Sequence, residues 1–289
     1  MPSLENQPHA LACPVDECSF TVDIAVKSSD GRTFGAHMKN LEWFTEGFPL
    51  GNSVTSTIEE PVVLMENGDV TELLLAFTHN SPAPDLTSRS LDTVIGLADA
   101  ADKYGVYHAL TACRQTMRLL SEESERNALG VLKSKLAHSN LEDIDYIAPM
   151  TMKLKIEEAL DFFGENHTKE FCRWLRYQQT YLMALEKYRK AISELPIRHK
   201  LPDIVDPKRP SWANINRTVV CPQFANFSRS VLAVLEETSS VGFPTPTTFR
   251  RTVKFVEALP GVPTPCLCGV DAWSEKVVKI LEDPPKWSK

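Results

Sequence analysis

The sequence predicts an α+β fold, in which an N-terminal domain with a β-hairpin and a short strand is followed by an all-helical region. Residues 20–26 alternate between apolar and polar side chains, which is the two-residue period of a strand. Asp30 and Gly31 follow as a tight-turn signal. From His37 onward, apolar residues recur mostly at the three-to-four-residue spacing of helices.

The hairpin begins with a strand whose apolar residues share one face: Phe20, Val22, Ile24 and Val26. Thr33 and Phe34 form the return strand, and His37 begins a helix. A phosphate-binding loop would need clustered glycines followed by Lys and Ser or Thr, and this segment has neither. No nucleophile or acid stands near His37 at a known catalytic spacing. We therefore interpret His37 as a structural residue rather than a catalytic one.

A short strand and three helices complete the predicted domain. The apolar run at residues 61–65 predicts a strand buried on both faces, and Asp69 is the expected N-cap of the next helix. A further helix starts after Ser88 or Ser90 and ends at Gly105, a residue suited to a left-handed C-cap. In the last helix, Cys113 lies in the apolar stripe and is expected to be a core residue. The helix that begins after Asp69 carries its apolar stripe at Val70, Leu73, Leu74 and Phe77.

This order of elements, together with single residues, resembles the BTB/POZ domain over residues 19–120. The family has an Asp in its first strand, an Asp-Gly turn, an aromatic and a His before a helix, and a Leu-Ser-Phe pattern after them. Thr45 stands here in the Ser position. The segment "FTHNSPAPDL" and the helix after it resemble the expanded BTB group of mushroom-forming fungi. The matching positions are Asp23, Asp30, Gly31, Phe34, His37, Leu41, Phe48, Lys103 and Tyr104.

The resemblance implies a non-enzymatic protein–protein interaction domain that forms homodimers and docks partners. In many relatives the domain links a substrate to the cullin scaffold of a ubiquitin ligase, and in others it recruits transcriptional partners. The expected function is therefore an interaction protein, with ubiquitin-ligase adaptor as the specific form. The alternative is a transcription-associated scaffold with a zinc-stabilised C-terminal helical region.

The first helix of the domain supplies the expected dimer interface. Spacing places Leu41, Phe44 and Phe48 on its buried side, which leaves Met38 and Trp43 as candidate interface residues. Trp is enriched where binding energy concentrates. The alternative is that Trp43 lies under the acidic loop that follows, within a monomer.

The rear part of the chain is predicted to be helical. Residues 1–18 are expected to be a flexible segment, 121–195 a helical extension, 196–222 a proline-rich irregular linker, and 223–289 a C-terminal helical region with three helices. The longest helix is predicted at residues 168–194. Its expected buried face consists of Phe171, Trp174, Leu175, Gln178, Leu182, Leu185 and Ile192.

Basic residues on that long helix permit two interpretations. They are either a surface for RNA or acidic partners, or a solvated face beside the apolar stripe, and the solvated face is the favoured reading. The residues concerned are Arg173, Arg176, Lys187, Arg189 and Lys190.

Seven cysteines are present, and some of them suggest a zinc site. Cys266 and Cys268 with Cys221 could supply three ligands, and Cys13 or Cys18 a fourth. Structural zinc sites usually show ligand pairs two to four residues apart. The alternative is a set of reduced thiols without a metal, and no other cofactor is expected.

Composition and motifs limit the remaining function classes. Residues 19–120 hold 13 acidic and 7 basic side chains, a net charge of −6, which is unsuited to a nucleic-acid backbone. The sequence lacks the glycine-rich, zinc-protease and nucleophile-elbow motifs of common enzymes. No apolar run is long enough to span a membrane, and the first residues do not resemble a secretion signal. We expect an intracellular protein of the cytoplasm or nucleus.

Overall fold

The computed structural model describes residues 11–48, 60–194, 198–200, 218–238, 243–260 and 270–287, and the chain divides into two compact units. The front unit runs from Met1 to His138 and the rear unit from Ser139 to Lys289. The division falls after the helix at residues 125–137, whereas the sequence placed the end of the domain at Leu120. No helix among the described residues combines the length and the apolar character needed to cross a membrane.

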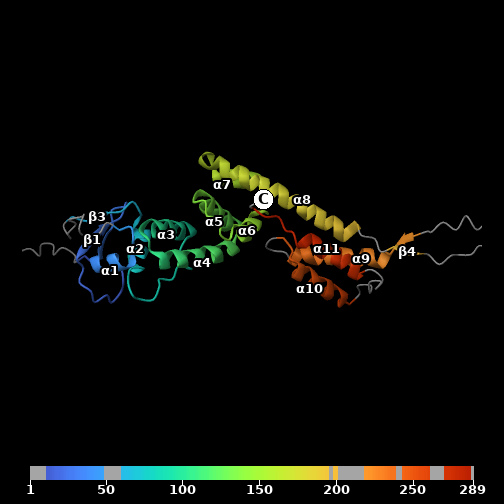
Figure 1. The fold of residues 1–289 in the computed structure, drawn as a ribbon, viewed down its shortest axis with the longest axis horizontal. Coiled ribbons are helices and arrows are strands. Elements are labelled where there is room, and N and C mark those ends of the chain that lie inside the picture. Colours follow the sequence, from blue (N-terminus) through green and yellow to red (C-terminus); the bar gives the residue numbers. More distant parts are fainter. Residues whose placement is uncertain are drawn as a thin grey trace, which may run out of the picture. The chain divides into compact units, whose positions relative to one another are not determined.

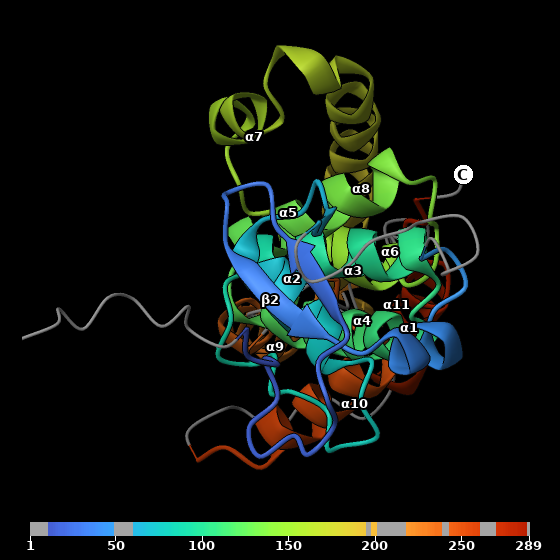
Figure 2. The same ribbon diagram turned by 90° about the vertical axis from the view of Figure 1, so that its left-hand side faces the viewer.

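The front unit combines a small mixed sheet with five helices in its described part (Figure 1). The sheet has the strand order β2-β1-β3, in which β1 pairs antiparallel with β2 and parallel with β3. Figure 2 looks onto the sheet end of this unit, with α2 and α3 behind the strands. The elements are β1 (Ile24–Lys27), β2 (Thr33–Ala36), α1 (Met38–Phe44), β3 (Val62–Val63), α2 (Gly68–Ala76), α3 (Leu91–Tyr104), α4 (Tyr107–Glu123) and α5 (Glu125–Ala137).

The α+β prediction is thus confirmed as a mostly helical fold with a small sheet near the N-terminus. The expectation that the first strand has one apolar and one polar face does not hold for β1, because Ala25 is buried as completely as Ile24 and Val26. Residues 24–26 of this central strand therefore have no exposed face. Phe20 precedes the strand and is exposed, so the predicted one-sided strand over residues 20–26 was wrong.

The strand expected at residues 61–65 is present as β3, but the expectation that it is buried on both faces was wrong. β3 has only two residues and lies at the sheet edge, where β1 is its single described partner. Leu64 is buried, but Val63 and Met65 are 68% and 84% exposed. A run of apolar residues does not distinguish an edge strand from a central one.

The helix signals of the front unit were more accurate. Ser90 caps α3 by accepting a hydrogen bond from the Thr93 N–H, and Gly105 ends this helix with φ +69°. Cys113 is fully buried in α4, as expected of a core residue. The cap of α2 is Asn67 rather than Asp69, since the Asn67 side chain accepts from the Val70 N–H.

The rear unit is built around one long helix, α8. Its described elements are α6 (Ile144–Ile147), the 3-10 turn η1 (Ala148–Thr151), α7 (Ile156–Phe163), the 3-10 turn η2 (Glu165–His167), α8 (Thr168–Glu194), β4 (Arg198–Lys200), β5 (Thr218–Val220), α9 (Pro222–Thr238), α10 (Pro246–Glu257) and α11 (Val270–Leu281). β4 and β5 pair antiparallel inside the range predicted as an irregular linker. The three C-terminal helices match the predicted ones with shifts at their ends.

The core of the rear unit lies between α8 and the three last helices. Tyr188 and Ile192 of α8 join a cluster centred on Trp273, whose ring meets Phe224 edge-on at 5.3 Å between centroids. Leu182, predicted to be buried, is 50% exposed. Tyr181, one position earlier, is buried instead, because the inward stripe of α8 follows its tyrosines: Tyr177, Tyr181 and Tyr188.

Candidate metal centre and exposed surfaces

Two cysteines and two histidines of the front unit converge on one point. Cys13 and Cys18 come from the segment before β1, His37 is the N-cap of α1, and His79 follows the end of α2. Cys13 Sγ lies 3.3 Å from His79 Nε2, and Cys18 Sγ lies 3.3 Å from His37 Nε2. The four donor atoms are all within 4.8 Å of one another. Both histidines are buried and both cysteines are partly buried.

Backbone hydrogen bonds fix the orientation of both imidazole rings. His37 Nδ1 lies 2.9 Å from the Thr21 carbonyl oxygen, and His79 Nδ1 lies 2.9 Å from the Leu75 carbonyl oxygen. A carbonyl oxygen only accepts, so each Nδ1 must carry the proton. In a neutral ring the lone pair then belongs to Nε2, the atom that faces a cysteine sulfur.

Burial favours the neutral forms of Cys13 and His79. It raises the pKa of the Cys13 thiol to about 11, and the neighbouring Cys18 adds to this effect. Burial also lowers the pKa of His79, and His37 beside it acts in the same direction. Neutral imidazoles and thiols can hydrogen-bond to each other, and the same atoms are a donor set for a transition metal.

The sequence had assigned the zinc ligands differently. Cys221 is buried among the aromatic residues of the rear core, while Cys266 and Cys268 lie outside the described residues. Cys13 and Cys18 had been considered only as a fourth ligand to those cysteines. The structure places them with two histidines, of which one had been interpreted as structural and the other had not been noticed. The available signal was the pair of cysteines separated by four residues.

The polar residues of the BTB-like pattern hold the hairpin to the helices. The Asp23 carboxylate accepts a hydrogen bond of 2.8 Å from the Met38 N–H and so caps α1. Asp30 accepts from Ser28 Oγ and from the Gly68 N–H at the start of α2, and these bonds lower its pKa. Gly31 has φ +88°, a conformation that favours glycine.

The apolar residues of the same pattern lie in the core. Phe34, Leu41 and Phe48 are all buried. Thr45 donates its hydroxyl hydrogen to the Leu41 carbonyl oxygen over 2.7 Å and closes the end of α1. A serine could make this bond as well, so Thr in the Ser position keeps the interaction.

Lys103 and Tyr104 at the end of α3 bind one carboxylate. Lys103 Nζ lies 2.9 Å from Glu66, and the Tyr104 hydroxyl donates to the same side chain over 3.0 Å. Glu66 precedes α2, so the pair ties α3 to the turn after β3. The Tyr104 ring packs on Phe48, with 5.3 Å between centroids. The Lys-Tyr dipeptide of the family pattern therefore has a structural role in this chain.

The two candidate interface residues differ in exposure. Trp43 is 74% exposed, the largest value among the described tryptophans, and Lys39 Nζ lies 5.5 Å from its ring centroid. Met38 is half-buried. Five helical positions separate the two by about 140° around α1, so they do not form one patch. The acidic loop that could cover Trp43 falls largely outside the described residues.

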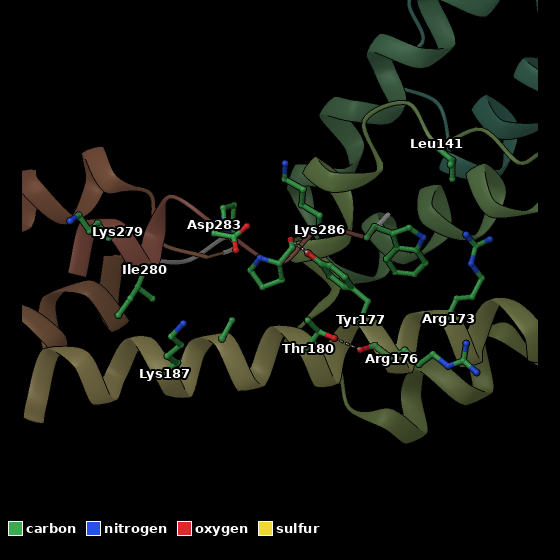
Figure 3. A pocket seen from close by; sticks show the side chains of 14 residues that line it. Leu141, Arg173, Arg176, Tyr177, Thr180, Lys187, Lys279, Ile280, Asp283 and Lys286 are labelled. Carbon is green, nitrogen blue, oxygen red and sulfur yellow. Dashed lines mark hydrogen bonds between the residues drawn. The ribbon is translucent and has the colours of Figure 1, made fainter. Parts of the chain in front are cut away.

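The rear unit has an open cleft along α8 with a volume of about 1040 Å³. Figure 3 shows Arg173 and Arg176 at one end and Lys187 and Lys279 at the other. Arg189, which had been grouped with them, instead forms an exposed ion pair of 3.0 Å with Glu236. The spread of the charges along α8 fits a solvated face, which the sequence analysis favoured over a partner surface.

Comparison with known proteins adds no relative. The chain matches no protein-family model, no curated protein sequence and no solved structure.

Proposed function

We propose that the chain is a non-enzymatic protein–protein interaction protein whose front unit acts as a BTB-like domain and self-associates through α1. Two kinds of observation support this proposal. The order of elements on which the resemblance rests is present, with a hairpin, a helix, a strand parallel to β1, and helices. The residues of the resemblance also hold these elements together, as Asp23, Asp30 and Lys103 do.

The observation that carries the proposal is the exposed indole of Trp43 on a fixed helix. Leu41 anchors α1 in the core, and Asp23 and Thr45 hold its two ends. The helix therefore presents Trp43 without needing to reorganise. Large aromatic side chains on rigid elements supply much of the energy of protein interfaces, since little conformational entropy is lost when they are covered.

The occupant we propose for this surface is a second copy of the chain. In a two-fold symmetric dimer the same patch is used by both copies, so a single substitution acts twice. Trp43→Glu places two carboxylates in such an interface. It leaves the core contacts of α1 intact, since Trp43 is not part of them.

Light scattering coupled to size-exclusion chromatography tests this directly. The full chain should be a dimer at micromolar concentration, and Trp43→Glu should be a monomer with an unchanged helical circular dichroism spectrum. Phe255→Glu is the matched control, because Phe255 is a 54% exposed aromatic residue on α10, and it should leave the dimer intact. A monomeric wild type, or a dimer that survives Trp43→Glu, would contradict the proposal.

Affinity purification of the same proteins identifies the kind of partner. Recovery of a cullin would extend the proposal to a ubiquitin-ligase adaptor. Recovery of chromatin proteins would instead favour the transcription-associated scaffold. Comparison of the full chain with the front unit shows which unit contacts the partner.

A further inference from the structure

We propose that Cys13, Cys18, His37 and His79 bind one structural Zn²⁺ ion in a tetrahedral site. The geometry of the donor atoms is the first argument. Zinc–sulfur bonds of about 2.3 Å and zinc–nitrogen bonds of about 2.0–2.1 Å place the corners of a tetrahedron roughly 3.3–3.8 Å apart. The distances from Cys13 Sγ to His79 Nε2 and from Cys18 Sγ to His37 Nε2 are both 3.3 Å, and no pair of donor atoms exceeds 4.8 Å. Small movements of the side chains would admit the ion.

The second argument is that the surroundings of the ligands are already organised for a metal. A histidine that binds zinc almost always donates its other ring N–H to a carbonyl or carboxylate. His37 and His79 both do this through Nδ1, to Thr21 and Leu75. The Val15 N–H also points at Cys13 Sγ over 3.4 Å, a contact that stabilises a thiolate. The rings need no rotation to offer Nε2.

The charge balance and the donor types select zinc. Two thiolates and two neutral imidazoles cancel the charge of a divalent ion, so the loaded centre can be buried without an unpaired charge. Calcium and magnesium prefer oxygen ligands, whereas this set contains only sulfur and nitrogen. Four protein donors fill a tetrahedral shell and leave no position for a substrate, which is the arrangement of a structural site.

A Cys13–Cys18 disulfide explains the arrangement less well. It would remove both thiol hydrogens and leave the two buried Nε2 atoms without a donor. Metal-free thiols that hydrogen-bond to the imidazoles are the remaining alternative, and it differs from the zinc site only in occupancy. Metal content and thiol reactivity therefore distinguish the zinc site from metal-free thiols.

The ion would join three segments that lie far apart in the sequence. The segment before β1 has its own backbone tie to the sheet, since the Gly35 N–H donates to the Ala12 carbonyl oxygen over 2.8 Å. The zinc would link this segment to the start of α1 and to the turn after α2. Metal binding displaces protons from the two thiols, and its free energy adds to that of folding.

Metal analysis of the full chain is the first test. Protein purified under reducing conditions without chelator, then loaded with zinc and exchanged into metal-free buffer, should hold one zinc per chain. Cys13→Ser/Cys18→Ser should lose it. Cys172→Ser should retain the zinc, because this thiol is exposed on α8. Cys266→Ser/Cys268→Ser should also retain it, and this variant tests the ligands that were expected from the sequence. Trp43→Glu should also keep its zinc, which separates this site from the dimer surface.

Two results of that analysis would overturn the proposal. One is a wild type that holds no zinc after loading. The other is zinc retained at full occupancy in Cys13→Ser/Cys18→Ser.

Thiol alkylation of the wild type tests the site without relying on a folded variant. In the zinc-loaded protein, peptide mass spectrometry should find Cys172 alkylated while Cys13 and Cys18 are protected. A chelator should make the latter two at least tenfold more reactive. Equal reactivity of Cys13 and Cys18 with and without zinc, or a disulfide between them under reducing conditions, would overturn the assignment. Cobalt loading should give the intense visible absorption of a tetrahedral thiolate site, and its absence would argue against the proposal as well.

Discussion

Each of the two units is stabilised internally by a different kind of interaction. In the front unit, polar side chains connect elements that are distant in sequence, as Asp23 does for α1, Asp30 for α2, and Glu66 for the end of α3. In the rear unit, the main ties are aromatic and aliphatic packing along α8, with Trp273 at the centre of the core. The front unit should therefore respond to pH and metal, and the rear unit chiefly to changes of side-chain volume.

Removal of α5 should have the largest effect on the front unit. This helix buries Leu129, Val131, Leu132 and Leu136. At about 2 kcal/mol for each such side chain, a fragment that ends at Glu123 should lose more than about 5 kcal/mol relative to one that ends at His138. Urea denaturation of both fragments measures this difference. Equal midpoints would show that the domain ends at Leu120, as the sequence suggested.

Trp174→Ala should strongly destabilise the rear unit. Trp174 is fully buried and donates its indole N–H to Thr151 Oγ1 over 2.8 Å. Truncation of such a residue costs about 3–5 kcal/mol. The matched control is Phe255→Ala, at a 54% exposed aromatic residue of the same unit, which should stay within about 0.5 kcal/mol. Calorimetry should show a large shift for the first variant only, and similar shifts would contradict the burial assigned to the two residues.

Features that depend on local residue spacing could be predicted from the sequence. Helix α8 was predicted with its observed ends, because apolar residues recur through it at helical spacing. The assignment of its buried face failed at Leu182, since leucine was preferred over tyrosine although the tyrosines face inward. Apolar periodicity is a local property, so it describes elements better than it describes their neighbours.

The cluster of two cysteines and two histidines and the sheet edge could not be derived in this way. Cys13 and His79 are 66 positions apart, and only the pairing of β1 with β2 and the packing of α2 bring them together. The exposure of Val63 likewise depends on the position of β3 at the edge of the sheet, where β1 is its single described neighbour. Both are properties of the topology, which the resemblance implied only in outline.

Glu66→Gln should have a moderate effect that depends on pH. Burial opposes the charge of Glu66, but its bonds with Lys103 and Tyr104 outweigh this and lower its pKa below the ordinary 4.5. A lowered pKa gives stability above the ordinary value, and this stability is lost as pH falls through the folded-state value. At neutral pH the substitution should cost about 1–2 kcal/mol, since half of the Lys103 side chain is exposed.

Urea midpoints of wild type and Glu66→Gln at neutral pH and at a pH below the lowered pKa check this prediction. The difference between the proteins should shrink at the acidic pH. Glu123→Gln, at an exposed position at the end of α4, serves as the control for a general loss of negative charge. A difference that is constant with pH would mean that the Glu66 charge contributes nothing.

Tyr188→Phe should have the smallest effect, and with the opposite sign. Tyr188 is buried in the rear core, and among the described residues no group hydrogen-bonds to its hydroxyl. A buried hydroxyl without a partner costs free energy, whereas Phe keeps the ring and its packing on Phe243 at 6.0 Å between centroids. The rear unit should therefore become more stable by about 0.5–1 kcal/mol, read from urea midpoints. Tyr177→Phe is the informative control, because the Tyr177 hydroxyl donates to the Pro285 carbonyl oxygen over 3.4 Å. Tyr177→Phe should be neutral or slightly destabilising. A loss of stability in Tyr188→Phe would show that the Tyr188 hydroxyl has a hydrogen-bond partner in solution. The core of the rear unit would then contain a polar interaction as well.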